Sequence, residues 1–200
     1  MDEEAKKQKF MKGAEAVLAR CEILGLPAVE KFRVEKKYRV AELDSKIRRE
    51  RTRREARLLH RAKEAGVLCP IVYKVGEFSI TMKYLEGKML HHELAGRKIR
   101  ASEIASAAKI LVALHKFDVI HGDFTPANLM NTEDGMAVID FGLGSISPDS
   151  EDKATDVVMM KKALGKDGGL FVSAYSKAGK REVVRLVSEI EGRARYMERG

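Results

Sequence analysis

Two short motifs stand close together in the second half of the chain. The first has the pattern H-x-D-x-x-x-x-N and is formed by His121-Gly122-Asp123-Phe124-Thr125-Pro126-Ala127-Asn128. The second, Asp140-Phe141-Gly142, follows an apolar run and begins 12 residues after Asn128. This order predicts a loop that presents a carboxylate and an amide, and then a short strand over 137–141 that delivers a second carboxylate.

These groups fit phosphoryl transfer from a nucleotide, which needs a positioned nucleophile and neutralised phosphate charge. Asp123 is expected to accept a hydroxyl proton or to orient a water molecule. Asn128 and Asp140 offer the hard oxygen ligands that Mg²⁺ prefers, so both are candidate metal and nucleotide ligands. Asp140-Phe141-Gly142 alone fits a strand that ends in a turn equally well, and it is the ordered pair of motifs that favours the catalytic interpretation.

A lysine and a glutamate in the first half complete this chemistry. Lys31 lies in a strand-like segment, where a lysine that reaches nucleotide phosphates is expected, and a glutamate from the next helix should hold it. Glu55 is placed to do so. Arg33 lies on the same face of the strand as Lys31, and Glu50 is the competing acid on the helix. A solvated surface charge remains the ordinary alternative for any one of them.

A turn that covers the nucleotide is expected over residues 12–17. The chain has no G-x-G-x-x-G loop there, and a single glycine permits a tight turn and a close backbone approach. The carboxylate within this turn needs a nearby cation, and a plain hairpin turn is the alternative interpretation. The candidate nucleotide-covering residues are Lys12, Gly13, Ala14, Glu15, Ala16 and Val17.

Composition sets wider limits. The chain has 200 residues, 38 Lys and Arg against 30 Asp and Glu, and 44% hydrophobic residues, which is typical of a folded globular protein. No apolar run is long enough to span a membrane, and the charged first residues do not have the pattern of a secretory signal. We therefore expect a cytoplasmic protein with no membrane partner. Two cysteines are too few for a disulfide framework.

The segments change character along the chain. Three short runs over 27–34, 71–75 and 78–85 are rich in β-branched and aromatic residues, and a charged helix is expected over 44–65. The second half is mainly helical, and Ser102 is placed to cap a helix whose apolar face includes His115. We expect His115 to be a satisfied core residue and His121 to brace the catalytic loop. The sequence thus predicts an α+β protein with a β-rich N-terminal lobe over 1–86 and a helical C-terminal lobe over 87–200.

Taken together, these motifs resemble the small atypical kinases of the KEOPS complex, the p53-related protein kinase family in its short archaeal-type form. The resemblance covers nearly the whole chain. It implies a reduced bilobal protein-kinase fold without a full activation segment, because no A-P-E follows Gly142. The residues that carry it are Gly13-Ala14-Glu15-Ala16, Lys31-Phe32-Arg33, Lys36-Lys37-Tyr38-Arg39, Leu43-Asp44, Arg51-Thr52, Glu55-Ala56-Arg57-Leu58-Leu59, Gly87, His121-Gly122-Asp123 and Asp140-Phe141-Gly142.

The resemblance also implies roles. Asp123 resembles the proton acceptor, Asn128 and Asp140 resemble the metal ligands, and Lys31 with Glu55 resembles the pair that orients the nucleotide. The implied adenine contacts come from the segment that joins the lobes, at Met82, Lys83 and Leu85.

The implied activity is that of an ATP- and Mg²⁺-dependent serine/threonine kinase or ATPase, capable of autophosphorylation. It would support threonylcarbamoyl modification of tRNA adenosine by a partner subunit of a KEOPS-type complex.

Residues 46–63 form a strongly basic segment, in which nine lysines and arginines face two glutamates. This segment and the basic tail over 192–200 are candidate contacts to tRNA, whose backbone favours such patches. A solvated helix face and a frayed terminus are the alternatives. Two other functions stay open: a small-molecule phosphotransferase of the aminoglycoside-kinase type, and a tRNA-binding scaffold with a vestigial kinase fold.

Overall fold

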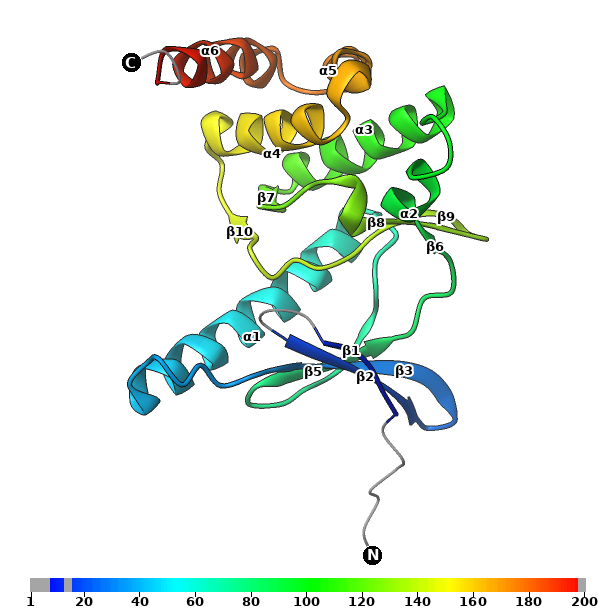
Figure 1. Ribbon diagram of the computed structural model, residues 1–200, viewed down its shortest axis with the longest axis vertical. Coiled ribbons are helices and arrows are strands. Elements are labelled where there is room, and N and C mark those ends of the chain that lie inside the picture. Colours follow the sequence, from blue (N-terminus) through cyan, green and yellow to red (C-terminus); the bar gives the residue numbers. More distant parts are fainter. Residues whose placement is uncertain (1–7, 13–15, 198–200) are drawn as a thin grey trace, which may run out of the picture. The chain divides into compact units, whose positions relative to one another are not determined.

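The computed structural model describes residues 8–12 and 16–197, and the chain divides into two compact units (Figure 1). The first unit comprises the residues up to His60 together with Pro70–Leu85. The second comprises Arg61–Cys69 together with the residues from Glu86 onward. The first unit carries the large sheet and the second carries most of the helices, so the predicted α+β class is confirmed. In the part of the chain that the structure describes, no helix is long and apolar enough to cross a membrane.

The first unit is built on a five-stranded antiparallel sheet in the order β1-β2-β3-β5-β4. Leu24 and Gly25 form the tight turn between β2 and β3, and both have positive φ, which suits the twist of a two-residue hairpin. The strand bounds are β1 Gln8–Lys12, β2 Ala16–Ile23, β3 Leu26–Arg33, β4 Val72–Val75 and β5 Ser79–Lys83.

Strand alternation decides which side chains of β3 are buried. Val29, Lys31 and Arg33 are two residues apart, so they share one face of the strand, and all three are buried. Phe32, between them, points to the opposite face and is exposed. The fold therefore buries two cationic side chains next to each other, and they require a carboxylate within reach.

Helix α1 (Ala41–Glu64) supplies that carboxylate. Its buried residues recur every three or four positions, as expected for one helical face. In the first unit this face is mixed, because it carries polar residues as well as leucines. The buried residues of α1 up to His60 are Asp44, Thr52, Glu55, Leu58 and Leu59.

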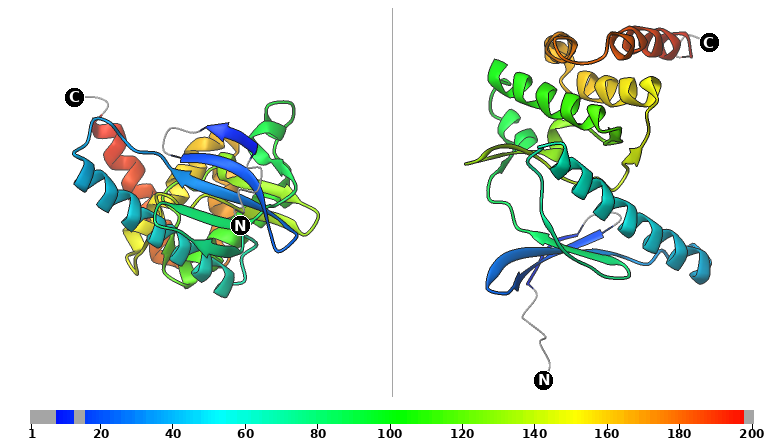
Figure 2. Two further views of the ribbon diagram at one scale, coloured as in Figure 1. Left: turned by 90° about the horizontal axis from the view of Figure 1, so that it is seen from below. Right: turned by 180° about the vertical axis from the view of Figure 1, so that it is seen from behind.

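The second unit combines helices with two small sheets, β6-β8-β9 and β7-β10. Helices α4 and α6 run side by side, and α5 packs on α3 and α4 (Figures 1 and 2). The element bounds are β6 Lys88–Met89, α2 Leu90–Leu94, α3 Ala101–Lys116, β7 Val119–Ile120, η1 Pro126–Asn128, β8 Leu129–Thr132, β9 Gly135–Val138, β10 Ser145–Ile146, α4 Ser150–Ala163, η2 Gly165–Asp167, α5 Gly168–Ser176 and α6 Arg181–Met197.

The N-terminus of α3 differs from the expectation that Ser102 caps it. The helix begins at Ala101, and Arg100 occupies the N-cap position. The carboxylate of Glu103 accepts the backbone N–H of Arg100 at 2.8 Å, so a side chain from inside the first turn satisfies the N–H of the N-cap residue.

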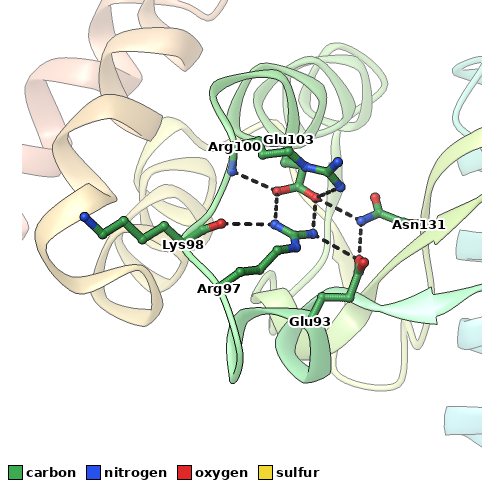
Figure 3. Close-up of polar contacts among 6 residues, drawn as sticks. All are labelled: Glu93, Arg97, Lys98, Arg100, Glu103 and Asn131. Carbon is green, nitrogen blue, oxygen red and sulfur yellow. Dashed lines mark hydrogen bonds and ion pairs between the residues drawn. The ribbon is translucent and has the colours of Figure 1, made fainter.

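Glu103 is also the centre of a polar cluster that ties α2 and α3 to β8 (Figure 3). Arg97 donates to both carboxylate oxygens of Glu103, at 2.6 and 2.9 Å, and also lies 3.3 Å from Glu93. Asn131 on β8 donates to Glu93 at 2.6 Å and to Glu103 at 3.0 Å. Because β8 begins directly after Asn128, this cluster fixes the strand that follows the H-x-D-x-x-x-x-N loop.

Because of this cluster, the free energy of unfolding should decrease as the pH falls into the acid range. Hydrogen bonds from Arg97 foremost hold the pKa of Glu103 far below its ordinary 4.5, against the opposing effect of burial. A carboxylate with a depressed folded-state pKa contributes its full stability above the unfolded-state pKa. That contribution is lost as the pH falls through the lower folded-state value.

We predict that Glu103→Gln lowers the free energy of unfolding at pH 7 by about 2 kcal/mol, because charged hydrogen bonds to Arg97 are lost. The difference in the free energy of unfolding between wild type and Glu103→Gln should narrow as the pH falls from about 4.5 towards about 3, since only the wild type has a titratable group at this position. Urea unfolding at several pH values measures both effects, with the exposed Glu133→Gln as the matched control. A difference in the free energy of unfolding that stays constant with pH would contradict the role given to the Glu103 carboxylate.

Candidate active site

In the first unit, Glu55 holds two cations at once. Its Oε1 accepts from Lys31 Nζ at 2.7 Å, and its Oε2 accepts from Arg33 Nη2 at 2.5 Å. Glu55 is 1% exposed, so the carboxylate is removed from water and its charge is matched by these side chains. Glu50, the competing acid on the helix, is exposed. The structure thus brings Lys31 and Glu55 together and adds Arg33 as a second partner, not as a replacement for Lys31.

The expected nucleotide-covering turn is only partly described. Gly13, Ala14 and Glu15 lie outside the described residues, and Lys12 is the last residue of β1. Ala16 and Val17 begin β2 and pair with Arg33 and Phe32 of β3. This register places the end of the turn beside the strand that carries Lys31.

The segment expected to contact adenine lies at the end of β5. Met82 is buried, Lys83 is exposed and Leu85 is half-buried. The N–H groups of Lys83 and Tyr84 donate to the carbonyls of Ile71 and Pro27 at 2.8 and 3.1 Å. The N–H of Leu85 makes no hydrogen bond to another described residue, so it can serve a ligand.

In the second unit, the loop over 121–128, here called the catalytic loop, places Asp123 against Asn128. The side-chain nitrogen of Asn128 donates to the Oδ2 and to the backbone carbonyl of Asp123, both at 2.8 Å. The turn of η1, with Pro126 at its start, brings the two residues together. Because the amide nitrogen faces Asp123, the amide oxygen of Asn128 is turned away from it and can act as a ligand.

Asp140 is connected to this loop through the backbone. The N–H of Ile139 donates to the carbonyl of Asn128 at 2.9 Å, next to the paired strands β8 and β9. Asp140 is exposed, has a φ of +60°, and accepts the N–H of Gly142 through Oδ1 at 3.0 Å. The predicted strand over 137–141 is observed as Gly135–Val138, which leaves Asp140 in a turn beyond its end.

His121 braces the loop, as expected from the sequence. Its Nδ1 accepts the N–H of Asp123 at 3.3 Å, and its Nε2 lies 3.1 Å from the carbonyl of Ile139 and donates to it. Burial lowers the pKa of His121, outweighing the nearby carboxylates, of which Asp156 is foremost. Burial thus favours the neutral imidazole, and the two hydrogen bonds place its proton on Nε2.

Asp156 on α4 anchors the same loop, and sequence reasoning missed it. Its Oδ2 accepts the N–H of His121 at 2.7 Å, and its Oδ1 accepts the N–H of Gly122 at 2.8 Å. His115 lies 3.3 Å from Oδ2 and holds the hydroxyl of Tyr175 at 2.8 Å. Asp156 is fully buried, so these hydrogen bonds replace the contacts with water that its side chain has lost. The only sequence signal was a lone acidic residue on the apolar face of a helix.

The donor set suits magnesium and a nucleotide. Asn128 provides an amide oxygen and Asp140 a carboxylate, which are hard ligands typical of Mg²⁺ sites. Lys31 and Glu55 form a buried ion pair of the kind that orients nucleotide phosphates. The groups present in each unit therefore fit ATP and Mg²⁺.

Comparisons with known proteins agree with these features. The RIO domain family matches residues 28–160. Proteins named probable bifunctional tRNA threonylcarbamoyladenosine biosynthesis protein, from Methanobrevibacter smithii and Methanocaldococcus jannaschii, are 38% and 37% identical over 200 and 199 residues. These alignments cover 92% and 94% of this chain but only 36% of each relative, so the chain spans about a third of their length.

Solved structures give the fold. WaaP in complex with acyl carrier protein aligns with a TM-score of 0.66 at 16% identity, covering 97% of this chain and 90% of that one. The Rio2 kinase from Chaetomium thermophilum, in a complex with ADP, Mg²⁺ and phosphoaspartate, aligns at 0.65 and 17% identity over 94% of this chain and 67% of that one. The predicted protein-kinase-like fold is confirmed by these neighbours.

The loop geometry predicts that Gly122 tolerates no side chain. Its φ is +77°, and a Cβ there would lie 2.4 Å from the carbonyl oxygen of Leu143. Gly122→Ala should lower the free energy of unfolding by about 2 kcal/mol or more. Gly169→Ala is the control, because a Cβ on that residue of α5 meets nothing within 4 Å and should be neutral or stabilising. Equal effects of the two changes in urea unfolding would contradict the geometry.

Proposed function

The chain belongs to the RIO domain family of atypical protein kinases, and from this membership we propose that it is an ATP- and Mg²⁺-dependent serine/threonine kinase or ATPase. The observation that carries the proposal is the Asp123–Asn128 contact within a loop braced by His121 and Asp156. It combines an acidic group of fixed position with an amide oxygen suited to a metal.

In the proposed reaction, Asp123 accepts the proton of the attacking hydroxyl or water. The oxygen of that nucleophile forms a bond to the γ-phosphorus while the bond from this phosphorus to the bridging oxygen of ADP breaks. Asn128 holds Asp123 through its amide nitrogen, so the carboxylate keeps one orientation during the step. When bound, Mg²⁺ neutralises phosphate charge, and Asn128 and Asp140 are the residues assigned to hold it.

In the first unit, Lys31 is assigned to the nucleotide phosphates and Glu55 to fixing Lys31. Residues 12–17 are assigned to covering the phosphates. Contacts from a turn of this kind are made largely by the backbone, and so they place little demand on side-chain identity.

The adenine is assigned to the segment at the end of β5. The N–H of Leu85 is the proposed donor, since it makes no hydrogen bond to another described residue. The assigned residues are Met82, Lys83 and Leu85.

The length of the segment after Gly142 bears on which molecule accepts the phosphoryl group. This segment reaches α4 at Ser150, which is too short a distance to form the peptide platform of ordinary protein kinases. We therefore propose that hydrolysis or autophosphorylation on serine or threonine is the main activity of the chain. An acceptor from the aminoglycoside class is disfavoured, because the described residues from Glu86 onward form the elements of the fold with no inserted substrate domain among them.

The named relatives support a role in tRNA modification. They are tRNA threonylcarbamoyladenosine biosynthesis proteins, and we propose that this chain serves the same modification in a KEOPS-type complex. The tRNA-modifying chemistry is assigned to a partner catalytic subunit, with this chain in an ATP-dependent supporting role.

We also propose that the chain contacts tRNA. The exposed side chains of α1 within the first unit include Lys46, Arg53, Arg54 and Arg57. The basic tail over 192–200 is the second candidate, although residues 198–200 lie outside the described part. Such contacts give an affinity that falls as the salt concentration rises and that depends little on the nucleotide sequence of the RNA.

The phosphoryl-transfer proposal is tested with γ-labelled ATP and Mg²⁺. Asp123→Asn and Asp140→Ala should each lower the release of phosphate and the labelling of protein by about 100-fold or more. Asp134→Asn, in the exposed turn between β8 and β9, is the matched control and should stay within about twofold of wild type. The ratio of free phosphate to labelled protein separates hydrolysis from transfer.

Equal background turnover in all four proteins would overturn catalysis by this chain and favour the scaffold alternative. Labelling of an added aminoglycoside in preference to water or protein would support the small-molecule alternative instead.

The RNA proposal is tested by measuring tRNA affinity against salt concentration. Arg53→Gln, Arg54→Gln and Arg57→Gln combined should weaken binding and lower the slope of log K against log salt, by about 0.7–0.9 for each phosphate that the protein no longer neutralises. The control removes the same charge at three exposed lysines of the second unit: Lys109, Lys116 and Lys177. The same decrease in slope in both triple variants would indicate a general charge effect and contradict a contact by α1.

A further inference from the structure

Helix α4 carries a second buried charge beside Asp156. Lys153 lies three residues before Asp156 on the buried face of the helix and is 1% exposed. Its Nζ donates to Asp118 Oδ1 at 2.6 Å, and the side chain of Asp118 remains 42% exposed. Lysines are almost never fully buried unless they are paired, so this contact allows the fold to enclose Lys153.

Asp118 occupies a position where a large side chain is unusual. It follows Phe117, the C-cap residue of α3, its N–H donates to the carbonyl of His115 at 3.2 Å, and its φ is +57°. Glycine is the usual residue at such a left-handed helix end, because it adopts a positive φ without strain. What an aspartate adds at this position is its carboxylate, and the carboxylate binds Lys153.

Asp118 also begins a two-stranded ribbon that joins the catalytic loop to the segment after Asp140-Phe141-Gly142. Its carbonyl accepts the N–H of Ser147 at 2.9 Å, and strands β7 and β10 then pair in antiparallel register. Gly122 continues this register, since a Cβ there would lie 2.4 Å from the carbonyl oxygen of Leu143. The ribbon therefore extends from Asp118 and Ser147 at its outer end to Gly122 and Leu143 at its inner end.

Helix α4 holds both ends of this ribbon. Lys153 binds Asp118 at the outer end, and Asp156 accepts the N–H groups of His121 and Gly122 at the inner end. Figure 1 shows α4 beside β7, which lies between these two contacts. A single contact would fix one point of the strand only, whereas two contacts from one helix fix its direction as well.

The inner end of the ribbon lies next to both acidic groups of the proposed site in the chain. Asp123 follows Gly122 directly, and Asp140 lies three residues before Leu143. Two hydrogen bonds at 3.0 Å close the turn between Asp140 and Leu143. The register of the ribbon thus determines where Asp123 stands relative to this turn. A misplacement of about 1 Å at a reacting group can slow a reaction about 100-fold.

The charge of Asp118 maintains its contact with Lys153 at neutral pH. The hydrogen bond from Lys153 foremost holds the pKa of Asp118 below its usual range, against the opposing effect of burial. The charges of Lys180 and Arg61 lower the pKa further. Asp118 is thus ionised near pH 7, where activity is measured.

Stability alone is a weak reason to bury this lysine. The cost of removing charges from water offsets most of their attraction, so replacing a buried ion pair with apolar side chains of similar size is often neutral or stabilising. A buried pair of fixed geometry can instead specify one arrangement of the chain. Methionine is unbranched, flexible and uncharged, so Lys153→Met fills much of the same space and removes only the ion pair.

We propose that Lys153 is a positioning residue for phosphoryl transfer: through Asp118 it fixes the register of the ribbon, and the ribbon sets Asp123 against the turn that carries Asp140. The inference rests on the proposed phosphoryl transfer and deepens it, because it adds a residue assigned to neither the nucleotide nor the metal. The residues assigned to the phosphates and adenine lie in the other unit, so loss of Lys153 should slow the chemical step and leave nucleotide binding intact.

The test measures kcat and the KM for ATP in the full 200-residue chain, together with the hydrogen exchange of the Ser147 N–H. Lys153→Met should lower kcat about tenfold or more and leave the KM within about twofold of wild type. Exchange at Ser147 should become about tenfold faster, because the outer end of the ribbon opens more often.

Lys161→Met is the matched control. Lys161 lies eight residues further along the same helix, and its Nζ donates to a carboxylate oxygen of Glu191 at the same 2.6 Å. Its substitution removes an ion pair of α4 away from the ribbon. Both kcat and the exchange of Ser147 should therefore stay within about twofold of wild type.

A double-variant cycle tests the route through Asp118. Asp118→Asn alone should lower kcat, because asparagine keeps the positive φ but leaves Lys153 without a negative partner. In the Lys153→Met chain the same change should alter kcat by less than about twofold, since the ion pair is already lost. Additive losses would show that the two residues act separately and would overturn this route.

The outcomes separate the inference from the proposed function. No turnover by the wild type overturns phosphoryl transfer and, with it, the role of Lys153. Wild-type turnover that Lys153→Met leaves unchanged overturns that role alone, as does a loss of turnover with unaltered exchange at Ser147. If Lys153→Met melts below the assay temperature, Asp118→Gly replaces it, because glycine accepts the φ of +57° and the same ion pair is removed.

Discussion

The catalytic loop depends on one buried carboxylate. Asp156 lies on α4, yet it accepts the N–H groups of both His121 and Gly122 and is itself contacted by His115. Without Asp156 the N–H of His121 would be buried and unsatisfied. The same carboxylate sets the direction in which the chain enters the turn at Asp123, and so the position of the acidic group follows from a helix residue 33 positions further along.

Some of this architecture is predictable from the sequence. The order of the two motifs predicts the loop, the strand and the neighbouring positions of Asp123 and Asn128, because those relations are local and set by spacing. The periods of the strand and the helix favour Lys31 and Glu55 as partners of each other, and the structure places their side chains in contact. The roles of these side chains in binding and catalysis stay predictions.

Two of the missed features are decided by tertiary contacts. Asp156 contacts residues 34 and 35 positions away, and its own neighbourhood shows only an acidic residue on the apolar face of a helix, with no indication of what it binds. In the sequence Arg33 is a rival of Lys31, whereas a carboxylate has two oxygens and Glu55 binds both cations.

The start of α3 was missed for a local reason. Serine is the better cap by propensity, but Arg100 takes the N-cap position and the buried Glu103, which also binds Arg97, accepts its N–H. Distant contacts thus decide the roles of Asp156 and Arg33, whereas the start of α3 is decided by a local contact between Glu103 and Arg100.

Gly122 has a consequence for how the molecule can be controlled. Many protein kinases carry an arginine beside the catalytic aspartate, and a phosphate on the segment that follows the metal site reorders the loop by pairing with such a residue. Here the position has no side chain, and the backbone of Leu143 occupies the space where one would begin. An on–off switch that depends on an arginine at this position therefore has no side chain to act on, because the fold leaves no room for one beside Asp123.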